Sequence, residues 1–471
     1  MPVLLPELLY IDGVFRRDMA VEFSTGSGLV TRVAPAAQLV VEEPQRGGHV
    51  VRLSGRALLP GFVNAHSHAF QRLTRGRGQW RPAAEERADF WTWRQAMYAT
   101  ANALRPDDVF EASRFCFIEM LCAGITSVGE FHYLHRDPDG KAYADPAELA
   151  TRVIAAADDA GIRICLLNAA YATGGIGEPL RPEQRRFATP DIEAFLTDTV
   201  ELADEAGRHP RASVGVAPHS LRAVPRDWLT SMHSLAFGLG APFHMHVSEQ
   251  PAEVTASLQA YNMRPVEVLA DLGVIDEHFT AIHATHLTFR EIEVLGTPGP
   301  TVCACPTTER DLGDGFLPGT ELLDAGARIA LGTDSQTVID PFEEMRLLEY
   351  HERLRRQKRV LIGATTHGGE RIETAPVLLS MASAEGARSL RLPAGRIGPD
   401  MCADLVAIDL EHRTLAGWTA DTLDAMLALS APASVVSDVW VGGVQRVHGG
   451  RHRLDRESAA AFRAVTRRIG T

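Results

Sequence analysis

Eight short apolar runs divide the central part of the chain, and most are separated by segments with a helical pattern of apolar positions. Residues 146–161 and 265–273, before the third and sixth runs, show that helical period clearly. The runs lie at residues 58–68, 125–134, 162–171, 212–220, 242–249, 279–287, 301–308 and 327–335. Eight alternating strands and helices predict an α/β fold, a (β/α)8 barrel of the TIM type.

The two ends of the chain have a different pattern, in which short alternating runs are separated by glycine turns. The pattern covers residues 1–57, where Asp12-Gly13 is a hairpin signal, and returns at 396–453. Because chain termini often lie close together, we expect both segments to form one small β-sandwich domain. The barrel would then span 58–395, and 454–471 is predicted to be a C-terminal amphipathic helix.

Composition excludes several classes of function. The formal net charge of −13 argues against nucleic acid or an anionic membrane as the main partner. No run approaches the ~18 apolar residues that cross a bilayer, and the first residues do not have the pattern of a signal peptide. The six cysteines show no CxxC spacing and are typical of buried thiols in a reducing compartment. We therefore expect a cytoplasmic protein that acts on a small molecule.

Residues that can bind a metal recur where the predicted strands end. The first run ends in His66-Ser67-His68, and residues two apart in a strand point to the same side. A single histidine is most often structural, but in a barrel all carboxyl ends of the strands surround one pocket. Imidazoles that meet there predict a divalent metal site. The later runs carry His219, His244, His246, Glu249, His283 and Asp334 at or near their ends.

Several motifs resemble those of the amidohydrolase superfamily, in particular its mononuclear deaminase branch. The matching segments are PGFVNAHSH (60–68), HVSE (246–249), CPTT (305–308) and LGTDS (331–335). The resemblance implies a homodimer with one divalent metal, Zn²⁺ or alternatively Fe²⁺. It also implies that Glu249 shuttles a proton to the leaving nitrogen and that Asp334 also accepts a proton from water. His283 would hold the attacking oxygen or polarise the substituent of the reacting carbon. The implied metal ligands are His66, His68, His246 and Asp334.

The scarcity of lysine agrees with a single metal. Only Lys141 and Lys358 occur, and both lie outside the eight runs. Binuclear amidohydrolases bridge two metals with a carboxylated lysine on the fourth strand, and barrel enzymes that form a Schiff base need a lysine on an inner strand. Neither chemistry is available to this sequence.

Arginines near aromatic residues and strand ends indicate an acidic substrate, because guanidinium groups bind carboxylates in a bidentate manner. Such groups occur after the first run, in Phe90-Trp91-Thr92-Trp93-Arg94, and after the fourth run. The segments AHSHAFQR, FWTWR, GEFHYLHRD, APHSLRAV and CPTTERDLGDG resemble those of the N-formimidoyl-L-glutamate deiminases. That resemblance implies that Arg94 and Tyr133 bind the side-chain carboxylate, and that the α-carboxylate is held by Gln71, His219 and Arg222.

The resulting hypothesis is hydrolysis of N-formimidoyl-L-glutamate to N-formyl-L-glutamate and ammonia, a reaction of histidine degradation. An alternative is a deaminase of a cyclic base or nucleoside of the guanine or cytosine type, which would need aromatic stacking rather than paired arginines. A related metal-dependent chloro- or amide hydrolase would use much the same ligands. A barrel without activity is disfavoured, because every expected ligand position is filled.

Overall fold

The eight predicted runs form eight parallel strands in the computed structural model, which describes residues 1–39, 49–81, 83, 89–366 and 370–470. Neighbours in the sheet are also neighbours in sequence, as the alternating pattern requires. The strands are β6 (Phe62–Ser67), β7 (Ile125–His132), β8 (Arg163–Ala170), β9 (Ala212–Pro218), β10 (Phe243–Val247), β11 (Phe279–His283), β12 (Thr301–Ala304) and β13 (Arg328–Leu331). The predicted (β/α)8 barrel is confirmed.

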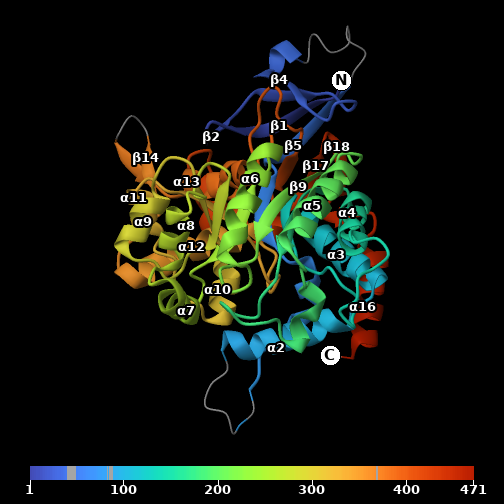
Figure 1. The fold of residues 1–471 in the computed structure, drawn as a ribbon. Helices are drawn as coiled ribbons and strands as arrows, with labels where there is room; N and C mark the ends of the chain where they lie inside the picture. Colours follow the sequence, from blue (N-terminus) through green and yellow to red (C-terminus); the bar gives the residue numbers. More distant parts are fainter. Residues whose placement is uncertain (40–48, 82, 84–88, 367–369, 471) are drawn as a thin grey trace.

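Helices surround this barrel (Figure 1). Apolar residues on one face of α4 are buried, and the helix ends at Gly161, whose φ of +83° suits a residue without a side chain. In the described part of the chain no helix combines the length and apolar character that a bilayer crossing needs. The α-helices are α2 (Phe90–Ala103), α3 (Pro106–Cys122), α4 (Glu148–Ala160), α5 (Ile192–Ala206), α6 (Leu229–Leu239), α7 (Pro251–Tyr261), α8 (Pro265–Asp271), α9 (Phe289–Leu295), α10 (Pro306–Leu312), α11 (Gly319–Asp324), α12 (Pro341–Arg356), α13 (Ala375–Ser380), α14 (Gly386–Ser389), α15 (Leu423–Ser430) and α16 (Asp455–Ile469).

Several single turns of other helix types join these elements. The π-helical turn η5 (Met381–Glu385) lies between α13 and α14. The 3₁₀ turns are η1 (Ala69–Thr74), η2 (Pro182–Phe187), η3 (Arg226–Trp228), η6 (Arg413–Leu415) and η7 (Ala433–Val435).

Both chain ends contribute to one mixed sheet of nine strands, drawn at the top of Figure 1. β5 lies in its middle, parallel to β1 and antiparallel to β16, so it joins the first and last parts of the chain. The strands are β1 (Val3–Ile11), β2 (Val14–Arg16), β3 (Met19–Phe23), β4 (Val30–Pro35), β5 (Val50–Pro60), β16 (Leu405–Asp409), β17 (Val436–Val441), β18 (Val444–His448) and β19 (Arg451–His452). A separate hairpin consists of β14 (Ala364–Thr366) and β15 (Arg371–Glu373).

The first apolar run, predicted as one strand from Leu58 to His68, is divided between two sheets. β5 ends at Pro60 and β6 begins at Phe62. At Gly61 the backbone N–H donates to the Asp404 carbonyl at 2.9 Å, and a Cβ there would lie 2.1 Å from Thr126 Oγ1. The apolar pattern runs through this change of sheet because both strands are buried there, so it could not reveal the break.

The barrel closes between β13 and β6 through a seam that we define as residues 64–68 and 332–336. The N–H groups of Thr333 and Asp334 donate to the His66 carbonyl at 3.1 and 3.0 Å, and His68 N–H donates to the Asp334 carbonyl at 3.0 Å. The Asn64 side chain adds two bonds to Thr333, at 2.6 and 2.9 Å. The seam therefore includes three of the predicted metal ligands.

Gly332→Ala should damage both the barrel and the metal site, because the new Cβ would lie 2.9 Å from the Cβ and carbonyl oxygen of His66. We expect a loss of about 1–3 kcal/mol in stability, typical of overpacking, and a lower metal content. Thermal unfolding and elemental analysis would measure the two effects. The control is Gly238→Ala in α6, where a Cβ meets nothing within 4 Å and should leave both quantities unchanged or slightly stabilise the helix. Equal behaviour of the two variants would contradict the seam argument.

Candidate active site

A pocket lies at the carboxyl ends of the barrel strands. Figure 1 shows α2, which carries four of its lining residues, at the end of the barrel opposite the nine-stranded sheet. All the predicted site residues except His66 line this pocket. The lining consists of His68, Gln71, Phe90, Trp93, Arg94, Met97, Tyr133, His219, Arg222, His246, Glu249, His283, Leu312 and Asp334.

Imidazoles and a carboxylate converge at the base of the pocket. Donor atoms of His66, His246, His283 and Asp334 all lie within 4.8 Å of one another. Asp334 Oδ1 is 3.2 Å from His66 Nε2 and 3.3 Å from His68 Nε2. The four predicted ligands therefore come together, and His283 lies close enough to be a further donor, which the sequence did not indicate.

The hydrogen bonds around these rings fit a metal ion. Nδ1 of His68 and Nδ1 of His246 lie 2.9 and 3.0 Å from the carbonyl oxygens of Phe131 and His219. Because a carbonyl only accepts, these Nδ1 atoms carry the hydrogen and leave the Nε2 lone pairs free. Among the described residues, neither nitrogen of the buried His66 has a hydrogen-bond partner. Burial lowers the pKa of His66 to about 3, so its ring is in the neutral form that binds metals.

Backbone strain accompanies the turn of these side chains into the pocket. Ser248, His283 and Asp334 follow or end β10, β11 and β13 with φ values of +52°, +67° and +46°. Such left-handed conformations cost a residue other than glycine of order 1–3 kcal/mol and concentrate at functional sites. Each of them redirects the chain at the point where it leaves the barrel.

Acidic and basic groups alternate above the metal ligands. His283 Nε2 is 3.7 Å from both Glu249 Oε1 and Asp334 Oδ2, and its Nδ1 is 3.4 Å from Glu309 Oε1. Burial alone would lower the pKa of His283, but the carboxylates of Glu249 and Glu309 hold it well above its usual value. Burial raises the pKa of Glu249, although His283 and Arg222 oppose the rise. Protons can therefore be held at this level of the pocket near neutral pH.

The two predicted arginines differ in their surroundings. Arg222 Nη2 lies 3.6 Å from Glu249 Oε2, and Arg222 Nε lies 3.9 Å from Glu253 Oε2. Arg94 makes no ion pair with any described carboxylate; its Nη2 donates to Tyr171 Oη at 2.6 Å. Its guanidinium carbon lies between 5.2 and 5.9 Å from the ring centres of Phe90, Trp91 and Tyr98. Arg94 thus offers an unneutralised positive charge to the pocket.

The remaining predicted substrate residues form one wall. Gln71 Nε2 donates to Tyr133 Oη at 2.8 Å. The Tyr133 ring lies 5.0 Å from the His68 ring and 5.6 Å from the His219 ring, and His219 stacks on His246 at 4.8 Å. This wall therefore connects the metal ligands to the polar groups that face the arginines.

The choice of His246 over its strand neighbour His244 agrees with the geometry. His244 is fully buried, and its Nε2 bonds to the Ser389 carbonyl at 2.8 Å, away from the pocket. This hydrogen bond connects β10 to α14.

Sequence reasoning missed Glu253, Glu309 and Tyr171. Glu253 accepts the N–H groups of Ser248 and Glu249 at 3.1 and 3.3 Å, and so fixes the backbone that carries Glu249. Glu253 and Glu309 lie in the first turns of α7 and α10, directly after HVSE and CPTT. Acidic residues in a first helical turn are common, so only their position next to a motif could have singled them out.

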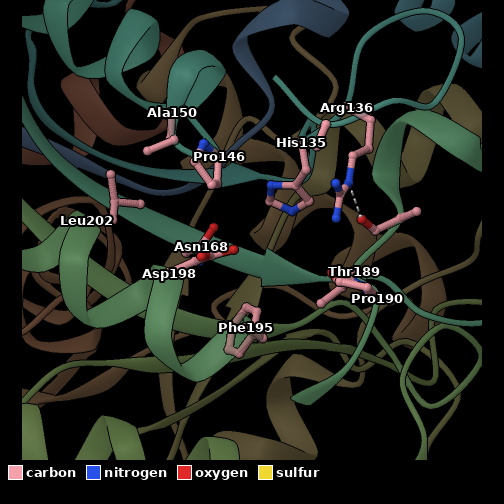
Figure 2. A pocket seen from close by; sticks show the side chains of 13 residues that line it. His135, Arg136, Pro146, Ala150, Asn168, Thr189, Pro190, Phe195, Asp198 and Leu202 are labelled. Carbon is pink, nitrogen blue, oxygen red and sulfur yellow. Dashed lines mark hydrogen bonds between the residues drawn. The ribbon is translucent and has the colours of Figure 1, made fainter. Parts of the chain in front are cut away.

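A second pocket lies between α4, α5 and the end of β8 (Figure 2). Its polar side chains serve structural bonds: Asn168 donates to Thr199 Oγ1, His135 Nε2 bonds to the Ala169 carbonyl, and Arg136 Nε donates to the Ala188 carbonyl. The pocket has none of the predicted ligands, so the candidate active site is the pocket at the strand ends.

Comparisons with known proteins agree with this site. Residues 57–446 match the model of the amidohydrolase family. A formimidoylglutamate deiminase from Pseudomonas aeruginosa is 37% identical over 87% of this chain and 88% of its own. An amidohydrolase from Brucella melitensis superimposes over the whole of both chains with a TM-score of 0.88 and 32% identity. An adenosine deaminase from Xanthomonas campestris, solved with bound zinc, reaches a TM-score of 0.82 and 25% identity over 100% of this chain and 98% of its own.

This chain belongs to the amidohydrolase family. The resemblance seen in its motifs is confirmed, and the protein is a hydrolase. A group of histidine and aspartate side chains that can hold a metal ion lies in its active-site pocket.

His66→Ala should abolish stoichiometric metal binding, because the ring is central to the ligand group and has no other hydrogen-bond partner in the described structure. We expect one Zn²⁺ or Fe²⁺ per chain in the parent protein and a small fraction of that in the variant, measured by elemental mass spectrometry. The control is His244→Ala, which removes an imidazole two residues from His246 without touching the pocket. Full metal content in the His66 variant would refute the ligand assignment.

Proposed function

We propose that the protein hydrolyses N-formimidoyl-L-glutamate to N-formyl-L-glutamate and ammonia, as part of histidine degradation. The observation that carries the proposal is the set of charged groups that line the pocket. Glu249 and Asp334 supply carboxylates, and two guanidinium groups accompany them: Arg222, 3.6 Å from Glu249, and Arg94, which has no ion pair with a described carboxylate. A substrate with a cationic amidine at one end and carboxylates at the other matches this set of charges. The relative from Pseudomonas aeruginosa supports the same substrate.

The two arginines that would bind the carboxylates differ in whether they contact an acidic residue. Arg94 and Tyr133 would bind the side-chain carboxylate, because Arg94 has no acidic partner among the described residues. Arg222, with Gln71 and His219, would bind the α-carboxylate and in doing so loosen its contact with Glu249. Binding would therefore also adjust the charge around the residue that moves the proton.

The reacting end would hold a single divalent metal through His66, His68, His246 and Asp334. When bound, such a metal lowers the pKa of a coordinated water towards neutrality. Zn²⁺ suits three nitrogens and one oxygen, and Fe²⁺ uses the same ligands.

The chain's own residues then handle the protons. Glu249 takes a proton from water as the new carbon–oxygen bond forms, and delivers it to the terminal nitrogen as the carbon–nitrogen bond breaks and ammonia leaves. Asp334 also accepts a proton from the water. His283 lies between Glu249 and Asp334, where its Nε2 can hold the oxygen that is added to the substrate. Glu309 Oε1 lies 3.4 Å from Nδ1 on the other side of the ring, where it can accept the Nδ1 hydrogen and orient the ring.

The alternative is deamination of a cyclic base or nucleoside, and one observation favours it: Phe90 and Trp93 line the pocket and could stack on a planar ring. A base, however, has no carboxylate for Arg94, so the guanidinium would stay without an anion once the substrate excludes water. We therefore propose the open-chain amidine, and not a cyclic base, as the substrate.

Two further parts of the proposal concern the whole protein. We propose a cytoplasmic homodimer that acts on a small acidic amidine, without nucleic acid or membrane as partners. The homodimer follows from the family resemblance, and the location from the free cysteines, which are typical of a reducing compartment.

Ammonia release tests the substrate directly. We expect the metal-loaded protein to release ammonia from N-formimidoyl-L-glutamate with N-formyl-L-glutamate as product, and a chelator to abolish the reaction. Guanine, cytosine and adenosine should give rates at least a hundredfold lower, because they cannot satisfy both arginines. A faster reaction with any of these bases would replace the proposal by its alternative.

Glu249→Gln should leave metal content intact but lower kcat by about 10²–10⁴, because the amide can neither accept nor release the proton. Single-turnover and steady-state kinetics on the metal-loaded variant would measure the loss. Metal analysis serves as its control, since Glu249 is outside the predicted ligand set. A variant with near-normal kcat would remove Glu249 from the mechanism.

A further inference from the structure

We infer that Tyr171 and Gln184 are positioning residues that hold Arg94 at a fixed place and so set the length of substrate that the pocket accepts. The inference rests on the proposed function, because it concerns the arginine assigned to the side-chain carboxylate. It starts from the contacts of a tyrosine and a glutamine that neither line the pocket nor belong to any recognised motif.

Arg94 is held by a neutral group rather than by a carboxylate. Tyr171 Oη accepts from Arg94 Nη2 at 2.6 Å, and the described structure gives this guanidinium no ion pair. A carboxylate partner would cancel the charge, whereas a phenol orients it and leaves it available to an anion. The Tyr171 ring also contacts the pocket wall, 4.8 Å from the ring of His219.

Gln184 fixes the tyrosine in turn. Its Nε2 donates to Tyr171 Oη at 2.8 Å and to Tyr98 Oη at 3.1 Å, and its Oε1 accepts the N–H of Arg181 at 2.9 Å. The glutamine side chain is almost completely buried, and three of its hydrogen-bonding positions are filled. The phenolic oxygen is therefore held by a second donor besides Arg94.

The same short segment, η2, holds the carboxyl end of helix α2. Arg186 is fully buried, and its Nη1 donates to the carbonyls of Ala101 and Leu104 at 2.5 and 2.6 Å, at the carboxyl end of the helix. Asn102 Nδ2 donates to the Glu183 carbonyl at 2.9 Å. Since α2 carries Arg94, the segment controls both where the helix lies and where the guanidinium points.

Because the Arg94 guanidinium is fixed, the pocket selects substrates by their length. The reacting carbon is held at the metal end and the side-chain carboxylate at Arg94, so a substrate one methylene shorter cannot satisfy both. Freed from Tyr171, the long arginine side chain could follow a shorter substrate. Loss of the tyrosine hydroxyl should therefore weaken binding and also relax selectivity.

The test is Tyr171→Phe, which removes the hydroxyl and keeps the ring. We expect KM for N-formimidoyl-L-glutamate to rise about tenfold with kcat little changed, as for loss of one charge-assisted hydrogen bond. The preference for this substrate over N-formimidoyl-L-aspartate should fall by a similar factor. In the Arg94→Met background the same change should add no further loss, because its target is gone. Gln184→Leu should give a smaller effect in the same direction.

The control is Tyr350→Phe on α12, which also removes a phenol hydrogen bond, to the Leu429 carbonyl at 2.9 Å, outside the pocket. It should leave KM and selectivity unchanged. If Tyr171→Phe keeps the parent KM and selectivity, or if its effect is undiminished in the Arg94→Met background, the inference is overturned while the proposed function stands.

Binding of glutarate, measured by calorimetry, distinguishes a failure of the proposed function from a failure of the inference about Tyr171. If the parent protein hydrolyses none of these amidines, the proposed function fails, and the glutarate affinity then decides the inference. Weaker binding of glutarate by both Tyr171→Phe and Arg94→Met would support it. Equal affinities in all three proteins would overturn it.

Discussion

The backbone pairing that closes the barrel is the constraint on which the rest of this structure depends. The carbonyl of His66 accepts from Thr333 and Asp334, and the carbonyl of Asp334 accepts from His68. The same residues direct their side chains to the metal position. Ligand distances are therefore set by main-chain hydrogen bonds across the last gap of the barrel, and the buried bonds of Asn64 to Thr333 lock their register. The hydrogen bonds that close the barrel therefore also fix the positions of the residues that carry the candidate metal ligands.

Two charged groups of the pocket, Glu249 and Arg94, lack a close ion-pair partner among the described residues. Glu249 lies between His283 and Arg222 at 3.7 and 3.6 Å, distances at which it interacts with both and makes a close hydrogen bond with neither. Arg94 rests on aromatic rings. Substrate can therefore displace weak internal contacts at little cost, and the low dielectric strengthens the contacts that replace them.

Periodicity predicted most of this fold, because each barrel strand is a buried run that ends where its polar residues begin. The expectation that polar residues at strand ends meet at one place then brought together His246, Glu249, His283 and Asp334, which line one pocket, and His66, which belongs to the ligand group at its base. These residues come from segments spread over almost 270 residues. Local sequence patterns did not predict two features of the structure. The change of sheet at Gly61 lies within one apolar run. Tyr171 ends the third predicted run, but a search for metal-binding and charged residues at strand ends does not select a tyrosine.

The barrel strands and the connecting elements contribute different parts of the site. In the proposed mechanism, protons are moved by groups on strands and strand ends, which the barrel fixes. Arg94 and Gln184 lie on connecting elements outside the barrel, and Tyr171 directly follows β8. Connections can change without disturbing the barrel, because their backbone contributes little to its hydrogen bonding. Family members with the same fold can therefore act on bases or on open-chain amidines. In this chain, selectivity depends on how firmly η2 holds α2 over an otherwise shared reaction centre.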